Sequence, residues 1–371
     1  MKDLPWTRET LYFTGDHFFR EIGKRIESAR KSVDVESYIF ENDELGRRLI
    51  RKLISAARRG VRVRVLVDAL GSSGSTDALA RAFQKSRCEF RIYHPLFGVG
   101  LLRFWRTYNR RNHRKVWLFD GREAWVGSMN VSRNHLVELS GTLAWRDFGV
   151  CIEGPGVSAL GEAFEKTWDK RHIRRAMPNL RDLWRRKLSV NAGSPVLLND
   201  SLPRRLGNFR ALIRRIRVAR RRVWFASAYF VPKLRLVRAL SFAAKKGLDV
   251  RVLVPRESDV FFMPWITATY YFVLIRRGVK LYEYLPGMYH GKAQLIDSWA
   301  AIGSSNLNHR SILHDLEVDL VLMRASNRSR LEKELRRDFA RSERLTLEKL
   351  RETPLLKRLA GSFLLLFRFW M

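Results

Sequence analysis

One set of polar residues occurs twice in this chain with nearly the same spacing. The first copy is His113, Lys115, Asp120, Gly127, Ser128 and Asn130, and the second is His290, Lys292, Asp297, Gly303, Ser304 and Asn306. A neutral imidazole can attack the phosphorus of a phosphodiester, and a second, protonated imidazole can protonate the leaving alkoxide. Lysine ammonium and asparagine amide groups can hold the non-bridging oxygens. The pattern predicts one active site made of two half-sites, with no metal and no cofactor.

The remaining histidines lack this repeated set of neighbours. An isolated histidine is more often a core or surface residue than a catalyst, and we interpret the others in that way: His17, His94, His135, His172, His309 and His314. The two copies also differ in length, because the second has one residue fewer between the aspartate and the glycine. That deletion predicts a shift of Asn306, so a phosphate contact is better supported for Asn130.

Each motif requires a strand that presents two side chains together. His113 and Lys115 are two residues apart, which places them on the same face of a strand. The sequence predicts that this strand runs to Phe119, turns at Asp120 and Gly121, and returns over residues 124–126. The motif aspartates then lie at hairpin turns, and the residues alone leave open whether Asp120 and Asp297 are catalytic or structural.

Internal repetition extends beyond the motifs. The segments AARRGVRVRVLVD (56–68) and AAKKGLDVRVLVP (243–255) are identical at most positions, and each contains a glycine that suits a helix C-terminus. A β-type run precedes each helix, so each lobe is predicted to begin strand, helix, strand. We expect an N-terminal lobe (1–171), a basic linker (172–195), a C-terminal lobe (196–345) and a basic, apolar tail (346–371). If the repeat were only structural, each lobe would have its own function; duplicated half-sites favour a shared site between the lobes.

Composition indicates a folded protein with a polyanionic partner. The chain has 371 residues, 46% of them hydrophobic, and Lys and Arg outnumber Asp and Glu by 71 to 37, a formal net charge of +34. This excess suits an anionic membrane surface or nucleic acid. Two cysteines give no disulfide framework, and the N-terminus lacks the pattern of a secretory signal. No run of about 20 apolar residues occurs, so we expect a peripheral protein on the cytoplasmic side of a membrane.

The motifs and their surroundings resemble the phospholipase D superfamily, and within it the bacterial cardiolipin synthase branch. The resemblance rests on the duplicated motif and on VDVESYIFENDELGRRL, WRDFGVCIEGPG, ASAYFVP, YHGKAQLID and GSSNLNHRS. It implies an α/β fold of two α/β/α sandwich lobes related by a pseudo-twofold axis, with the active site between them. It also implies transfer of a phosphatidyl group through phosphohistidine, with His113 as nucleophile and His290 as acid; the residues alone leave that assignment nearly even.

The resemblance also suggests partners for the histidines. A nucleophilic imidazole needs an acceptor for its other ring nitrogen, and the family has acidic residues where this chain has Asp147 and Glu317. Each follows the histidine of its own half by about thirty residues. We expect the phosphoryl oxygens to be bound by Lys115, Lys292, Ser128, Asn130, Ser304 and Asn306.

The phosphodiester itself is predicted to be a lipid. Residues 94–115 and 355–371 mix aromatic and aliphatic side chains with basic ones, as at a membrane interface, although both could instead pack in the fold. The apolar run 260–275 is predicted as a core helix, with Phe261, Phe262 and Trp265 as gate residues. Anionic phospholipids are the expected partners, with phosphatidylglycerol as acceptor. The alternatives are a phospholipase D-type hydrolase, and a nuclease or nucleic-acid-binding protein, which the positive charge would also suit.

Overall fold

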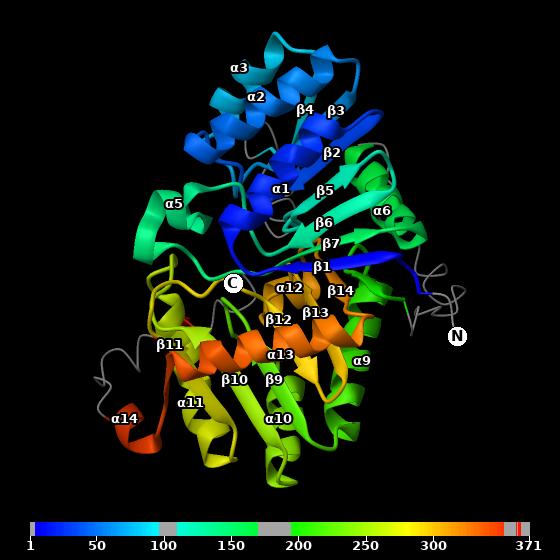
Figure 1. Cartoon of the computed structure of the whole chain (residues 1–371). Coiled ribbons are helices and arrows are strands. Elements are labelled where there is room, and N and C mark those ends of the chain that lie inside the picture. Colours follow the sequence, from blue (N-terminus) through cyan, green and yellow to red (C-terminus); the bar gives the residue numbers. More distant parts are fainter. Residues whose placement is uncertain (1–3, 96–109, 170–193, 352–360, 362, 365–371) are drawn as a thin grey trace, which may run out of the picture.

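The protein is described by a computed structural model that covers residues 4–95, 110–169, 194–351, 361 and 363–364. These residues form two α/β lobes, one above the other in Figure 1, and each lobe is one mixed sheet with helices on both faces. The predicted two-lobed fold of α/β/α sandwiches is confirmed.

The N-terminal lobe contains a seven-stranded sheet in the order β1-β7-β6-β5-β2-β3-β4. Its strands are β1 (Arg8–Tyr12), β2 (Ser32–Ser37), β3 (Arg62–Asp68), β4 (Glu89–Tyr93), β5 (Val116–Phe119), β6 (Glu123–Gly127) and β7 (Gly149–Glu153). Its α-helices are α1 (Gly15–Ser28), α2 (Glu44–Arg58), α3 (Thr76–Gln84), α5 (Val137–Ser140) and α6 (Ser158–Trp168). Short 3₁₀ helices are η1 (Arg133–His135), η2 (Gly141–Leu143) and η3 (Pro155–Val157). Helices α1, α2 and α3 share a core with one face of the sheet, and α6 packs on the other.

The C-terminal lobe contains an eight-stranded sheet in the order β15-β11-β10-β9-β12-β13-β14-β8. Its strands are β8 (Val196–Leu198), β9 (Arg222–Ala226), β10 (Asp249–Pro255), β11 (Lys280–Tyr284), β12 (Ala293–Ile296), β13 (Trp299–Gly303), β14 (Val318–Val321) and β15 (Ser342–Arg344). Its helices are α9 (Leu202–Val218), α10 (Leu234–Lys245), α11 (Met263–Arg276), α12 (His309–Leu313), α13 (Ala325–Ala340) and α14 (Leu347–Arg351). Helices α9, α10 and α11 cover one face of the sheet, and α13 covers the other.

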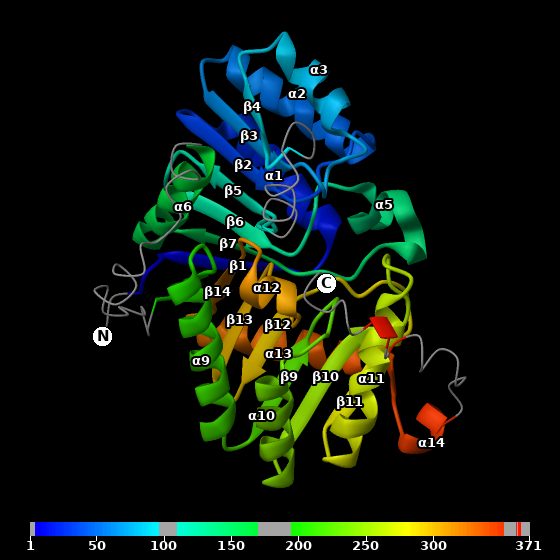
Figure 2. The ribbon, with the colours of Figure 1, turned by 180° about the vertical axis from the view of Figure 1, so that it is seen from behind.

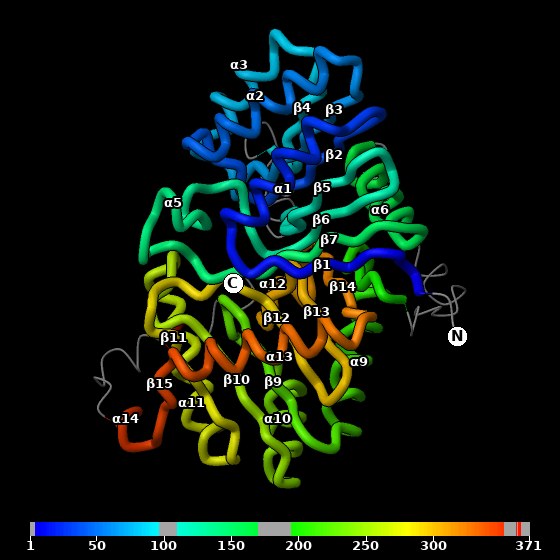
Figure 3. The backbone as a smooth tube through the Cα atoms, viewed as in Figure 1, coloured from blue at the N-terminus to red at the C-terminus, as the bar shows by residue number. Residues whose placement is uncertain are grey.

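The two lobes repeat the same path of the chain, which the tube in Figure 3 makes visible. Three parallel strands, β2-β3-β4 or β9-β10-β11, are joined to an antiparallel hairpin, β5-β6 or β12-β13. Each lobe begins with one more strand and helix than the sequence predicted, because β1 and β8 add antiparallel edge strands before α1 and α9. The duplicated sequence therefore folds as a duplicated sheet.

Local sequence explains the elements that support the site. Gly60 and Gly247 follow α2 and α10 with φ of +91° and +83°, the left-handed conformation that glycine adopts most easily. Pro264 stands in the first turn of α11, a position where proline suits the start of a helix. None of the helices in the described ranges combines the length and apolar character needed to span a bilayer.

The two sheets share one hydrophobic core. It joins the inner faces of β5, β6 and β7 to those of β12, β13 and β14, with α6 and α13 at its sides, as Figures 1 and 2 show. Fully buried members come from both lobes, among them Phe148, Val150, Ala300 and Ile302. The lobes are therefore fixed relative to one another, so a site between them is formed by rigid elements.

Some predicted segments lie outside the described residues. These are the linker apart from Ser194 and Pro195, residues 96–109, and residues 352–360, 362 and 365–371 of the tail. Within the tail, Gly361 lies against the backbone of Trp265, Leu364 packs beside Met263 and Ile266, and Phe363 is 62% exposed.

Candidate active site

The histidine and lysine of each motif lie together at the start of a hairpin. Lys115 donates a hydrogen bond from Nζ to the carbonyl of His113 at 2.8 Å, and Lys292 makes the same bond to His290 at 2.6 Å. Arg114, between the first pair, points to the opposite side and bonds to α6 at Ala163 and Thr167. Strand alternation therefore presents one imidazole and one ammonium group per lobe.

Short stretches of backbone pairing between the lobes bring the two hairpins together. The segment before β5 pairs with the second lobe through the bridge Asn112–Leu316, and the segment before β12 pairs with the first lobe through Arg146–Tyr289. The backbone N–H of His113 donates to Leu316, and that of His290 donates to Arg146. Each motif histidine is thus placed by the other lobe.

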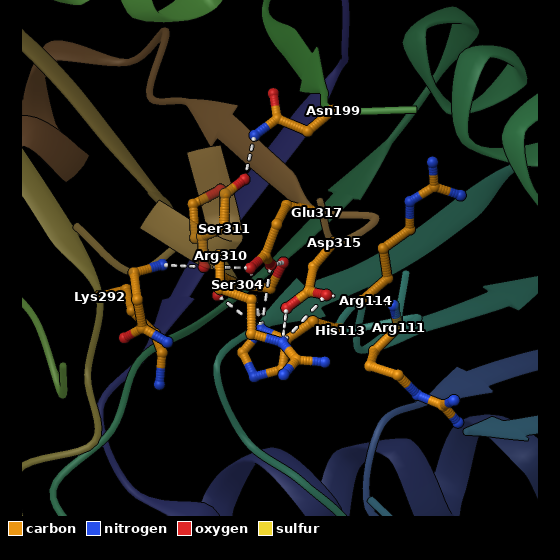
Figure 4. A network of polar contacts seen from close by, with 12 residues as sticks. Arg111, His113, Arg114, Asn199, Lys292, Ser304, Arg310, Ser311, Asp315 and Glu317 are labelled. Carbon is orange, nitrogen blue, oxygen red and sulfur yellow. Dashed lines mark hydrogen bonds and ion pairs between the residues drawn. The ribbon is translucent and has the colours of Figure 1, made fainter. Parts of the chain in front are cut away.

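Each histidine–carboxylate pair likewise joins a histidine of one lobe to a carboxylate of the other. His113 Nδ1 lies 3.0 Å from Glu317 Oε1, and His290 Nδ1 lies 2.7 Å from Asp147 Oδ2. The predicted acidic residues do contact the histidines, but each holds the histidine of the other lobe. His113 Nδ1 also lies 3.1 Å from the carbonyl of Ser304, which can only accept, so Nδ1 carries the proton (Figure 4). Both Nε2 atoms remain for chemistry.

The motif serines bind carboxylates, which corrects their assignment to the phosphate. Ser128 donates its hydroxyl to Asp147, and Ser304 donates to Glu317. A second side chain completes each cluster, and Figure 4 shows Ser311 doing so at Glu317. The equivalent position in the first lobe is His135, whose Nδ1 lies 3.2 Å from Asp147.

Sequence reasoning treated His135 as an ordinary histidine and did not consider Ser311. Both are buried, and both accept a backbone N–H from the motif asparagine, Asn130 or Asn306. A signal for them exists, because each lies five residues after that asparagine. The residue types differ between the lobes, so the signal appears only after the repeats are aligned.

Asn306 is not displaced by the shorter second motif, which corrects the expectation of a shift. Its Oδ1 accepts the backbone N–H of Tyr229, as the Oδ1 of Asn130 accepts that of Ile39. The missing residue is absorbed in the hairpin turn: strand pairing closes at Phe119–Glu123 in the first lobe and at Ile296–Trp299 in the second. The strands on either side keep equivalent register.

The structure gives Asp120 and Asp297 backbone contacts far from the histidines, which favours the structural one of the two roles that the residues alone left open. Each stands at the hairpin turn with φ near +50°, at the far end of the strand from its histidine. Seven residues of extended chain separate Asp120 from His113, about 23 Å. The Asp120 carboxylate accepts backbone N–H groups at residues 30–32, and Asp297 accepts those at 220–222. These bonds tie each turn to the loop before β2 or β9.

Burial sets the charge of the site. It lowers the pKa of His113 well below its usual value and that of His290 to about 3, and the nearby lysines act in the same direction. Burial also lowers the pKa of Lys115 to about 7 and that of Lys292 to about 8. Both imidazoles are therefore neutral at neutral pH, and a bound phosphate anion would raise the pKa of all four groups.

The two carboxylates differ in their proton affinity. Burial raises the pKa of Glu317 to about 7. Burial acts in the same direction on Asp147, but His290 and His135 hold its pKa well below the usual value. Asp147 is ionised across the neutral range, whereas Glu317 takes up a proton there.

One cluster in the described ranges could hold a cation. Ligand atoms of His135, Asp147 and His290 lie within 4.8 Å of one another, and all three residues are buried. Two of these residues, Asp147 and His290, are already joined by a hydrogen bond in this cluster.

Comparison with known proteins finds a family match in each lobe. The family model described as "Cardiolipin synthase, PLD-like domain" matches residues 22–168 and again residues 212–341, one match in each lobe. Cardiolipin synthase A of Pseudomonas entomophila is 31% identical over 365 residues, covering 94% of this chain and 72% of that protein. Cardiolipin synthase B of Salmonella typhi is 33% identical over 322 residues, covering 84% of this chain and 75% of that protein. The structure of phosphatidylserine synthase from Haemophilus influenzae shares the fold, with a TM-score of 0.74, 13% identity, and coverage of 98% of this chain and 95% of that one.

Proposed function

The chain belongs to the family of cardiolipin synthase, phospholipase D-like domains, and from this premise we propose that it is a phosphatidyltransferase that works through a phosphohistidine. The crossed pairing carries this proposal. His113 and His290 each donate Nδ1–H to a carboxylate of the other lobe, so two free Nε2 atoms are held by one rigid framework. Two imidazoles fixed in this way suit a two-step displacement at phosphorus.

The difference in pKa between Asp147 and Glu317 supports His113 as nucleophile and His290 as acid. Ionised Asp147 stabilises an imidazolium on His290, the form that protonates a leaving alkoxide. Glu317, with its pKa raised to about 7, gives His113 less of that stabilisation and favours the neutral imidazole needed for attack. The carbonyl of Ser304 fixes the tautomer in which Nε2 has the lone pair.

The proposed reaction has two displacements. In the first, His113 Nε2 forms a bond to phosphorus and the bond to the leaving oxygen breaks. His290, which takes up a proton at Nε2 when the bound phosphate raises its pKa, gives that proton to the leaving oxygen. In the second, His290 takes the proton of the acceptor hydroxyl, whose oxygen bonds to phosphorus and releases His113. Lys115 and Lys292 balance the negative charge on the phosphoryl oxygens, and the amide nitrogens of Asn130 and Asn306 are proposed to donate to them.

The proposed donor is a phospholipid and the proposed acceptor is phosphatidylglycerol. The relatives named cardiolipin synthase support this choice, and the excess of positive charge suits anionic lipid. If the donor is also phosphatidylglycerol, glycerol leaves. We place the protein peripherally at the cytoplasmic surface of a bacterial membrane.

Two other functions use the same catalytic residues. Water in place of the acceptor hydroxyl would make the protein a phospholipase D-type hydrolase. The net charge of +34 would also suit a nuclease or nucleic-acid-binding protein. The curated relatives favour lipid over nucleic acid.

Lipid mass spectrometry tests the proposal. Cells that express the wild type should accumulate cardiolipin, whereas cells that express His113→Ala or His290→Ala should not. His17→Ala is the control, because His17 is an exposed histidine on α1. Phosphatidic acid as the product would indicate the hydrolase. Unchanged lipids, with DNA cleavage that depends on His113, would indicate the nuclease.

A further inference from the structure

The helical layer on the outer face of the C-terminal sheet contains no acidic residue. Asp and Glu are absent from α9, α10 and α11. The equivalent helices of the N-terminal lobe, α1, α2 and α3, each have an acidic residue in the first turn, Asp16, Glu44 and Asp77. The equivalent helices of the two lobes therefore differ in charge.

A groove between α9 and α10 concentrates this positive charge. Its volume is about 580 Å³, and it is lined by Arg210, Arg214, Arg217, Arg235 and Arg238. All five are exposed, and none forms an ion pair with a described residue. Arginines on other helices do have acidic partners, such as Arg48 with Glu44 on α2 and Arg336 with Glu332 on α13.

Like charges in one groove repel each other, so they favour an anionic partner that supplies the missing counter-charge. Here the guanidinium groups surround an apolar floor made by Phe209 and Ile213. A guanidinium binds phosphate oxygens through paired N–H groups, so phosphate is the chemistry that the groove recognises.

Further basic residues lie between the groove and the active site. Figure 2 shows α9 and α10 side by side, with α12 at their inter-lobe end. Lys233, before α10, lies over the ring of Phe209 at 5.4 Å. Burial and the charges of Arg205, Arg310, Arg110 and Lys233 lower the pKa of His314, just after α12, to about 4. Arg310 also acts on His113. The inter-lobe end of this face therefore lies toward the active site (Figure 2).

Exposed apolar side chains on the same helices favour a bilayer over nucleic acid as the partner. Val218 and Leu234 are 67% and 63% exposed, and Phe242 is 46% exposed. Aliphatic and aromatic groups enter the boundary between headgroups and acyl chains while arginines contact the phosphates. Nucleic acid offers no equivalent for exposed Val and Leu beside its backbone.

We propose that the α9–α10 face docks the protein onto an anionic phospholipid bilayer, with the groove arginines on headgroup phosphates and Val218, Leu234 and Phe242 in the interface. The proposal rests on the proposed function, because it assigns the lipid surface to one lobe. It predicts that attachment depends on these arginines and not on the net charge of the chain.

Vesicle cosedimentation of the full chain tests the proposal. The probe is phosphatidylcholine vesicles with and without phosphatidylglycerol. The variant Arg210→Gln, Arg214→Gln, Arg217→Gln should bind the anionic vesicles about 100-fold more weakly, because each basic residue near such a surface contributes about fivefold. A second variant, Arg235→Gln with Arg238→Gln, should lose about 25-fold by the same reasoning.

The N-terminal lobe provides the matched control. Arg51→Gln, Arg58→Gln, Arg81→Gln removes the same charge from exposed arginines of α2 and α3 that have no described ion pair. This control should retain most of the wild-type affinity. Equal losses in the control and the groove variant would overturn the proposal, and so would equal binding of the wild type to neutral vesicles.

Two further measurements distinguish the alternatives. Duplex DNA that binds more tightly than the anionic vesicles, and depends on the same arginines, would overturn the bilayer in favour of nucleic acid. Cosedimentation needs no turnover, so it also separates docking from catalysis. A wild type that docks through the groove but makes no lipid product would support this inference and defeat the proposed function.

Discussion

The crossed histidine–carboxylate pairs predict unequal effects for two similar substitutions. Asp147→Asn keeps the size of the side chain but removes the charge that lies 2.7 Å from His290 Nδ1. That charge raises the pKa of His290 against burial and Lys292, so its loss makes the imidazolium harder to form. A buried hydrogen bond to a charged group contributes about 1.5–3 kcal/mol, which corresponds to a loss of about 10- to 150-fold in kcat.

Glu317→Gln should lower kcat less than Asp147→Asn does. Burial raises the pKa of Glu317 to about 7, so near that pH the carboxyl is already partly neutral and glutamine resembles its protonated form. We expect a loss of less than about tenfold, because only the ionised fraction contributes the charged hydrogen bond. Single-turnover measurements with labelled phospholipid should show that Asp147→Asn slows both formation and breakdown of the phosphoenzyme, since His290 serves as acid and then as base.

Nitrogen NMR of the histidine rings tests the crossing directly. Asp147→Asn should change the ring signals of His290 and leave those of His113 in place, although Asp147 and His113 belong to the same half of the sequence. Asp120→Asn is the matched control, because Asp120 contacts backbone groups far from both rings. A response of His113 to Asp147→Asn, or equal kinetic losses for the two carboxylate variants, would refute the reasoning.

Three other predictions follow from the site. The ratio kcat/KM should fall as pH rises through about 7 to 8, where Lys115 and Lys292 lose their protons. The fall in kcat should come at higher pH, because bound phosphate raises the pKa of both lysines. If kcat and kcat/KM fell over the same pH range, this prediction would be contradicted. Activity should persist in EDTA, because His113 and His290 carry the proposed steps; loss on chelation that one divalent cation reverses would exclude a metal-free mechanism. Asp120→Asn should lower the free energy of unfolding by about 2 kcal/mol in urea titrations and leave kcat unchanged, whereas a large loss of kcat in folded protein would restore a catalytic role.

Much of the site could be predicted because its information is local. The His-x-Lys spacing places His113 and Lys115 on one face of a strand without reference to the rest of the chain. The duplication adds a second half-site, and two halves of one active site must face each other. Gly60 and Gly247 likewise mark helix ends through their own backbone preference.

Residue roles that depend on distant partners could not be predicted in the same way. Asp147 and Glu317 follow their own histidines in sequence, yet the exchange of segments between the lobes gives each of them to the other histidine. Ser128 has the type and position of a phosphate ligand, but its rotamer points at Asp147. Nothing in the spacing distinguishes these outcomes, because the choice depends on packing across the interface.

The two asparagines and the two motif aspartates show the division between sequence and structure most clearly. From the sequence, the deletion after Asp297 predicted a shift of Asn306, and the aspartates were equally suited to catalysis and to structure. The fold absorbs the deletion in a turn, where a loop can lose a residue without changing strand register. It also turns Asp120 and Asp297 toward the backbone N–H groups of a neighbouring loop, which donate to their carboxylates. The sequence determined which histidine and lysine pairs are offered to the phosphate. The tertiary structure decided what holds them, because those contacts join residues that are far apart in the chain.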